Sequence, residues 1–132
     1  MTTKNRAAIL AQPSVHEILK DIWNGTGELS GWYIGRYVIM PDHVHFFARP
    51  AMNASKMSDW IKMWKSVSSR RIATAIHNRG GLWQRDYFDR YLRTGESYSE
   101  KWLYVQENPV RAGLVDCAAK WPFAGEIHRL EF

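Results

Sequence analysis

Residues 32–49 of the chain read WYIGRYVIMPDHVHFFAR, and this stretch decides the fold. It holds two runs rich in β-branched and aromatic residues, 32–40 and 43–49, on either side of Pro41-Asp42. Two such runs joined by a short turn are typical of a β-hairpin. We therefore predict two antiparallel strands, with the other elements arranged around them.

Helices are predicted before and after this hairpin. Residues 14–24 open with a capping box of Ser14 and Glu17, carry apolar residues at helical spacing, and end at Gly25-Thr26-Gly27. Residues 54–78 form the longest predicted helix, because apolar residues recur there three and four positions apart.

The second half of the chain is predicted to add a strand at 85–93 and a further helix. A capping box of Ser97 and Glu100 opens this helix. It is expected to end at Asn108, because Pro109 disfavours helical backbone in the residue before it.

The tail, residues 110–132, is expected to be irregular, with a short turn at 111–114 and with Trp121 and Phe123 docked on the core. The predicted order is thus helix, strand, strand, helix, strand, helix. This order fits a ferredoxin-like α+β fold, an antiparallel sheet with helices on one face, that lacks its first, central strand. The length fits one domain, 1–132.

Composition limits the class of protein and its compartment. The chain has no apolar run near the roughly 20 residues that span a bilayer, and no stretch typical of a signal peptide. Its one cysteine, Cys117, excludes an intrachain disulfide and a multi-cysteine zinc site. We therefore expect a cytoplasmic protein with no membrane partner.

The positive charge of the chain is concentrated in one segment. The net charge is +5, and the six basic residues and one acid between Ala51 and Leu82 account for the whole excess. Such a segment is a candidate surface for nucleic-acid phosphates. It is equally typical of a solvated helix, because the basic side chains spread around several faces of the predicted helix.

Two histidines in the second predicted strand are the first candidate site residues. His43 and His45 lie two positions apart, so their side chains point to the same face of the strand. Imidazole nitrogens placed in this way can converge on one metal ion. Surface or hydrogen-bonded histidines give the same pattern, so the pair alone leaves both interpretations open.

A tyrosine and an asparagine in the last predicted helix are the second candidate. Tyr104 and Asn108 are four residues apart and share one helix face. That face lies roughly 80–120° from the apolar stripe of Tyr98, Trp102 and Val105. A core tyrosine would lie on the stripe, although a half-buried tyrosine beside a capping asparagine fits as well. The amide oxygen of Asn108 at a helix C-terminus would suit a cation.

Several motifs follow one another along the chain. They are Pro41-Asp42-His43-Val44-His45, then Leu82-Trp83-Gln84-Arg85 with Tyr87-Phe88-Asp89-Arg90, then Tyr104 followed by Asn108-Pro109-Val110-Arg111-Ala112-Gly113-Leu114-Val115, and finally Trp121-Pro122-Phe123. Together they resemble the REP-associated tyrosine transposases, which belong to the one-tyrosine HUH transposases of the insertion-sequence type. The resemblance runs from about Lys4 to Phe123.

The resemblance implies a site and a reaction. His43, His45 and Asn108 would hold a divalent metal, Mg²⁺ or Mn²⁺, and Tyr104 would be the nucleophile. The family cleaves single-stranded DNA beside hairpins of palindromic repeats, leaving a 5′-phosphotyrosine and a free 3′-OH. Some relatives dimerise, so the chain is expected to act as a monomer or a homodimer.

Basic side chains that would hold the DNA backbone form two groups, one on the long helix and one near the strand ends. They are Lys65, Arg70 and Arg71, and Arg36, Arg85 and Arg90. Phosphate contacts of this kind supply most of the affinity of proteins for DNA. Trp or Tyr rings would stack on unpaired bases.

The sequence departs from the family at its start. Relatives begin with a strand just before the segment that matches Thr3-Lys4-Asn5-Arg6, and this chain starts after it. A misassigned start or truncated chain, a decayed remnant, and a strand supplied by another chain each explain the difference. Two other functions stay open beside the transposase: an inactive or domesticated hairpin-binding protein, and a metal nuclease or phosphoesterase that uses water.

Overall fold

The structure is a computed structural model that describes residues 1–77, 81–84 and 95–131, with Gly95 and Glu96 described for their backbone alone. The elements are η1 (Lys4–Arg6), α1 (Pro13–Ser30), β1 (Trp32–Ile39), β2 (Val44–Pro50), α2 (Met57–Ile76), α3 (Gly95–Val105), α4 (Asn108–Arg111), η2 (Ala118–Lys120) and β3 (Ala124–Glu126). The α+β class is confirmed. The predicted strand at 85–93, with Arg85 and Arg90, lies outside the described residues.

The predicted hairpin is confirmed. β1 and β2 pair antiparallel, and Val38 lies opposite His45. The amide of Met40 donates to the carbonyl of His43 at 2.8 Å, which closes the turn. The amide of Leu10 donates to the carbonyl of Pro41 at 2.9 Å, so the chain before α1 also holds the turn. The hairpin therefore places the histidines at one end of the sheet.

The third strand of the sheet comes from the tail. β3 pairs antiparallel with β1, and the strand order is β2-β1-β3. The expectation of an irregular tail was wrong here, because three residues that lack a strand pattern of their own complete the free edge of β1. The docking of Trp121 is confirmed: its indole N–H donates to the carbonyl of Ile39 at 3.0 Å, and Phe123 packs against the core.

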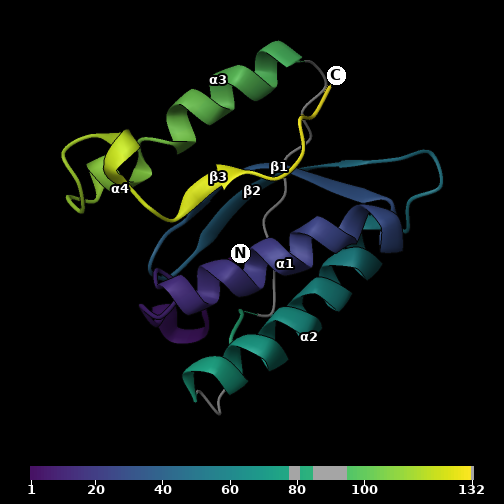
Figure 1. Cartoon of the computed structure of the whole chain (residues 1–132), viewed down its shortest axis with the longest axis horizontal. Helices are drawn as coiled ribbons and strands as arrows, with labels where there is room; N and C mark the ends of the chain where they lie inside the picture. Colours follow the sequence, from purple (N-terminus) through teal and green to yellow (C-terminus); the bar gives the residue numbers. More distant parts are fainter. Residues whose placement is uncertain (78–80, 85–94, 132) are drawn as a thin grey trace.

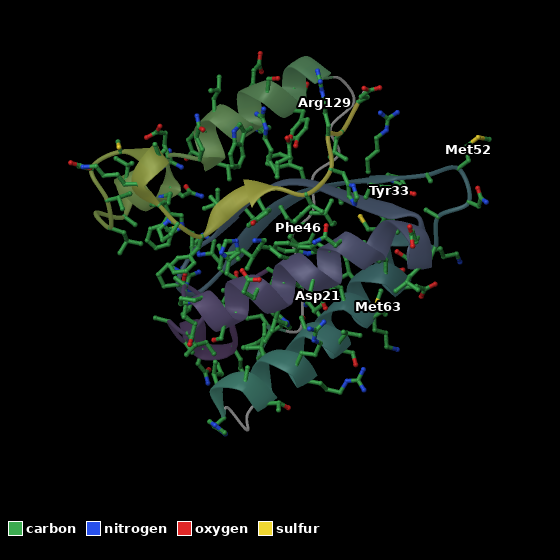
Figure 2. The ribbon with its side chains drawn as sticks, in the orientation of Figure 1. Asp21, Tyr33, Phe46, Met52, Met63 and Arg129 are labelled. Carbon is green, nitrogen blue, oxygen red and sulfur yellow. The ribbon has the colours of Figure 1, made fainter. Side chains whose placement is uncertain are left out.

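Helices α1 and α2 cover one face of the sheet (Figure 1). Phe46 of β2 points to this face, and Figure 2 shows it between the sheet and α1. Its ring lies 5.6 Å from that of Trp23 in α1 and 5.3 Å from that of Trp64 in α2. The two indoles lie in parallel planes, with their ring centroids 6.3 Å apart. This aromatic cluster joins both helices to the hairpin.

Helix α3 lies on the opposite face of the sheet (Figure 1). Neighbouring residues of a strand point to opposite faces, so Phe47 points away from the core that Phe46 enters. The Phe47 ring lies 4.9 Å from that of Tyr98 and 6.4 Å from that of Trp102, both in α3. The expectation that the helices share one face therefore holds for α1 and α2 and fails for α3.

Helix α1 is longer than predicted. It continues through Gly25-Thr26-Gly27 and ends at Ser30, where Gly31 takes a left-handed conformation (φ 80°) that glycine adopts without strain. The interior glycine Gly27 is needed for packing, because the ring of Tyr33 occupies the space that a Cβ would fill. Packing against β1 thus outweighs the low helix propensity of glycine.

The predicted capping box of Ser14 and Glu17 does not form. Gln12 is the N-cap of α1, its side chain makes no capping hydrogen bond, and the hydroxyl of Ser14 lies one position inside the helix. Pro13 at the first helical position starts α1, because its missing N–H and fixed φ suit that place. Helix α3 begins at Gly95, so Ser97 lies inside it.

The first four residues pair with two segments that are far apart in the sequence. Thr2 bridges to His43 and Thr3 bridges to Trp83, both antiparallel. The amides of Val44 and Gln84 donate to the carbonyls of Met1 and Thr2, each at 2.8 Å. An extended segment thus lies between the start of β2 and residues 82–84, where the sequence predicted no strand. Among the described residues, no helix is long and apolar enough to cross a membrane.

Candidate metal and tyrosine site

The two histidines lie together at the turn end of the hairpin. Their ring centroids are 4.8 Å apart and their planes are nearly perpendicular. Both side chains point to one face of β2, as predicted, and His45 shares this face with Phe47. Because Phe47 packs against α3, the histidine pair lies on the face of the sheet that α3 covers.

Asp42 orients His43. One carboxylate oxygen lies 2.7 Å from Nδ1 of His43, and the other lies 2.8 Å from Nε of Arg6. Burial acts to raise the pKa of Asp42, but the hydrogen bond and charge of His43 and the guanidinium of Arg6 outweigh it, so the pKa is lowered. An ionised Asp42 accepts the Nδ1 proton of His43, which leaves the Nε2 lone pair for a metal. The sequence indicated Asp42 as a turn residue alone.

His45 is held in its neutral form. Burial lowers its pKa to about 4, and the positive charges of His43, the Met1 amine and Arg111 act in the same direction. Neutral imidazole is the form that binds metal ions. Near neutral pH, His45 therefore presents a lone pair rather than a charge.

Tyr104 and Asn108 lie on two successive helices. Tyr104 is the residue before the last of α3, and its side chain is 66% exposed. A turn at residues 106–107 separates it from Asn108, which begins α4. The expectation that Asn108 ends the helix of Tyr104 was wrong. Pro109 suits the first turn of a new helix, so Asn108 begins a helix and the negative helix end offers it no cation site.

Arg111 joins these two residues. Its guanidinium carbon lies 4.1 Å from the centroid of the Tyr104 ring. One of its amino groups donates to the backbone carbonyl of Tyr104 at 2.8 Å and also to Oδ1 of Asn108. The sequence motif contained Arg111 without a role. Its position three residues after Asn108 and seven after Tyr104 would have placed it on the same face of a continuous helix.

Arg111 also acts electrostatically on the histidine pair. The positive charge of Arg111 is one of the causes that lower the pKa of His45. Within the described residues, no hydrogen bond or ring contact joins Tyr104 or Asn108 directly to either histidine. The same residues contain no cluster of three or more His, Cys, Asp or Glu side chains suited to a metal, so an additional protein ligand would have to be of another kind, such as Asn108.

The basic residues predicted on the long helix have different surroundings. Lys65 donates to the carbonyl of Gln84 at 2.6 Å, and Arg71 pairs with Asp21 at 2.8 Å. Arg70 is exposed. Lys65 and Arg71 thus hold α2 to neighbouring segments. A role in DNA binding stays a prediction for all three residues.

Arg36 lies on the same face of the sheet as α3. Its guanidinium carbon is 5.8 Å from the ring centroid of Tyr98 and 5.5 Å from that of Trp102. It also pairs with Glu126 of β3 at 3.3 Å. Arg36 therefore helps to dock α3, and its predicted DNA contact stays untested.

Comparison with known proteins agrees with the motifs. Residues 1–108 match the family described as "Transposase IS200 like". The chain is 24% identical over 100 residues to a putative REP-associated tyrosine transposase of Haemophilus influenzae, covering 69% of this chain and 56% of that protein. It is 26% identical over 115 residues to a REP-associated tyrosine transposase of Escherichia coli, covering 86% and 62%. The chain thus spans little more than half the length of these relatives.

The fold also matches a solved structure. A REP-associated tyrosine transposase bound to a REP hairpin superposes with a TM-score of 0.70 at 21% identity, over 93% of this chain and 71% of that one. This likeness concerns the fold, while the family match covers most of the sequence. The chain therefore belongs to the IS200-like transposase family.

Proposed function

We propose that the chain is a metal-dependent endonuclease and strand transferase that acts on single-stranded DNA bearing hairpins or palindromic repeats. The observation that carries this proposal is the placement of the paired imidazoles of His43 and His45 on the sheet face covered by the helix that bears Tyr104. Its solved relative is bound to a REP hairpin, which supports DNA of that shape as the substrate.

The donor atoms suit Mn²⁺ and, less well, Mg²⁺. Asp42 holds the Nδ1 proton of His43, which leaves Nε2 for a metal, and the lowered pKa of His45 keeps that imidazole neutral. Asn108 would add an amide oxygen. Imidazole together with oxygen ligands is a set that Mn²⁺ accepts, whereas Mg²⁺ prefers oxygen alone. When bound, such an ion would neutralise charge on the scissile phosphate.

The side chains then have distinct roles in the proposed reaction. The phenol oxygen of Tyr104 attacks the phosphorus, and a bond from phosphorus to this oxygen replaces the bond to the 3′ oxygen. The phenol loses its proton and the departing 3′ oxygen gains one, which leaves a 5′-phosphotyrosine and a free 3′-OH. Because the ester stays activated on Tyr104, a second 3′-OH can later displace the tyrosine and join two strands.

The test is the covalent adduct. The chain is incubated with single-stranded hairpin oligonucleotides taken from palindromic repeats of its own genome, with Mn²⁺, and the products are separated under denaturing conditions. We expect an adduct with wild type and none with Tyr104→Phe or with EDTA. An adduct that persists in Tyr104→Phe would refute the assignment. Cleaved DNA without attached protein would instead identify a hydrolytic nuclease.

A non-catalytic hairpin-binding function is the second candidate. It is favoured by two observations: Oδ1 of Asn108 already accepts a hydrogen bond from Arg111, and no hydrogen bond or ring contact among the described residues joins Tyr104 to the histidines. In this case hairpin binding would survive the double change Tyr104→Phe and His43→Ala with no cleavage by wild type. Its affinity would fall steeply with salt concentration.

A further inference from the structure

Arg111 contacts both residues of the proposed tyrosine–asparagine half of the site. Its planar guanidinium lies over the Tyr104 ring at 4.1 Å, a distance at which the ring face attracts a cation. The same group donates to the carbonyl of Tyr104 at 2.8 Å. This carbonyl lies near the end of α3 and also accepts a longer hydrogen bond, at 3.3 Å, from the amide of Glu107. Arg111 thus holds both the backbone and the ring of Tyr104.

Arg111 also occupies the oxygen that a metal would need. Its amino group donates to Oδ1 of Asn108, which is the proposed ligand atom. A divalent cation and a guanidinium repel each other at short range, and both compete for the same lone pairs. Metal binding through Asn108 therefore requires Arg111 to release that oxygen.

The released guanidinium would lie beside the proposed nucleophile. Its central carbon lies 4.1 Å from the centroid of the Tyr104 ring, and the phosphate that Tyr104 attacks would bind beside that phenol. A guanidinium pairs with phosphate oxygens by two parallel hydrogen bonds, which a single ammonium group does not reproduce. A DNA phosphate would thus supply a new partner for Arg111 at the moment when Asn108 turns to the metal.

We propose that Arg111 is a positioning residue that couples DNA binding to metal binding. In the free protein it holds Tyr104 and withholds Asn108 from the metal. When a DNA phosphate binds, Arg111 exchanges the oxygen of Asn108 for the phosphate, and Asn108 completes the metal site. This inference rests on the proposed function, and by linkage DNA must raise metal affinity by the same factor as metal raises DNA affinity.

The experiment measures Mn²⁺ affinity by electron paramagnetic resonance, with and without a non-cleavable hairpin oligonucleotide. The variants are Arg111→Gln, which removes the charge, and Arg111→Lys, which keeps the charge but loses the paired N–H donors of the guanidinium. Arg129→Gln is the matched control, because Arg129 lies at the end of the molecule away from α4 (Figure 2). Thermal unfolding verifies that each variant is folded.

We expect wild type to bind Mn²⁺ at least about fivefold tighter with the hairpin than without it. Arg111→Gln should bind Mn²⁺ several-fold tighter than wild type without DNA, and the hairpin should then add little. Its single-turnover rate of adduct formation should nevertheless fall by about tenfold or more, because Tyr104 is no longer held. The Mn²⁺ affinity and the rate of Arg111→Lys should lie between those of wild type and Arg111→Gln. Arg129→Gln should match wild type in both.

A structural role alone would lower metal affinity and rate together, so an unchanged or weaker Mn²⁺ affinity in Arg111→Gln without DNA overturns the proposal. The gain in Mn²⁺ affinity should also disappear in the Asn108→Ala background, and a gain that persists there overturns it as well. Adduct formation by wild type separates the two claims. If wild type makes no adduct while Arg111→Gln still gains Mn²⁺ affinity, the proposed function fails and the coupling stands.

Discussion

The two halves of the proposed site differ in how many packing contacts and hydrogen bonds hold them in place. His43 and His45 belong to a hairpin that carries buried residues of the core, and Asp42 and the N-terminal segment hold the turn from outside. The tyrosine half lies at the end of α3, which docks through Tyr98 and Trp102.

Because of this difference, side chains of the tyrosine half should contribute little to the stability of the fold. Tyr104 is 66% exposed and its neighbour Leu103 is 61% exposed, so little apolar area is lost if their side chains change. Segments with few buried contacts open at lower free energy than core strands. The histidine half is therefore preorganised by the fold, and the tyrosine half is adjustable.

The largest expected effect is a loss of adduct formation with no loss of stability. Tyr104→Phe removes the oxygen that we propose as the nucleophile, so adduct formation should fall by more than about a thousandfold. The melting temperature should stay close to that of wild type because the side chain is exposed. Adduct assays and calorimetry on the same sample measure both. A loss of several degrees would show that the tyrosine half also supports the fold.

The next effect tests the histidine half through the core beneath it. Trp64→Ala removes a fully buried indole that packs against Phe46 of β2, and should lower the free energy of unfolding by about 3–5 kcal/mol. The comparison variant is Trp102→Ala in α3, whose side chain is half-buried and should contribute less than half as much. Urea denaturation measures both. Equal losses would contradict the difference between the two halves.

A smaller effect is a pH dependence of stability in the metal-free protein. The pKa of His45 is lowered to about 4 in the fold, against about 6.5 in an unfolded chain, so the unfolded state binds more protons between these values. The contribution of His45 to stability should therefore be complete above about pH 6.5 and decrease as the pH falls toward 4, by roughly 2 kcal/mol after allowance for solvent screening.

The control for this pH dependence is His45→Gln. In the presence of EDTA, urea denaturation from pH 4 to 7 should give a flatter profile for the variant than for wild type. The lowered pKa of Asp42 acts mainly below about pH 4, outside this window. Parallel profiles for the two proteins would show that other groups cause the dependence.

The smallest effect concerns the orientation of His43, one of the proposed metal ligands. Asp42→Asn keeps the size of the side chain but removes the charge that accepts the Nδ1 proton of His43 and pairs with Arg6. Loss of a carboxylate behind a metal-binding histidine lowers metal affinity by about tenfold or more. Isothermal titration with Mn²⁺ measures the change, with Asp116→Asn on the surface as the control. An unchanged affinity would show that the turn itself orients His43.

Much of the fold could be predicted because it follows from local patterns of apolar and polar residues. The hairpin, the long helix and the shared face of the two histidines follow from periods of two and of three to four residues. The helix ends were harder. Helix α1 continues beyond Gly25 and Gly27, where Gly27 packs against Tyr33. It begins at Pro13 rather than after a Ser14 cap.

The members of the candidate site stay predictions, and the contacts around them could not be predicted from the sequence. His43, His45, Tyr104 and Asn108 were identified from spacing and from the family resemblance. Asp42 and Arg111 were missed as partners, because their roles depend on where a turn and a helix break place them. The break after α3 changed Asn108 from the end of one helix to the start of another.

By itself the sequence determined the α+β class, the hairpin with its histidine pair, and membership of a transposase family. Only the tertiary structure decided that residues 124–126 complete the sheet, that residues 1–4 lie between the turn and Trp83, and that α3 takes the opposite face. The reason is physical. Local periodicity acts over a few residues, whereas these pairings join backbone groups from distant segments and depend on which edges and faces the rest of the chain leaves open.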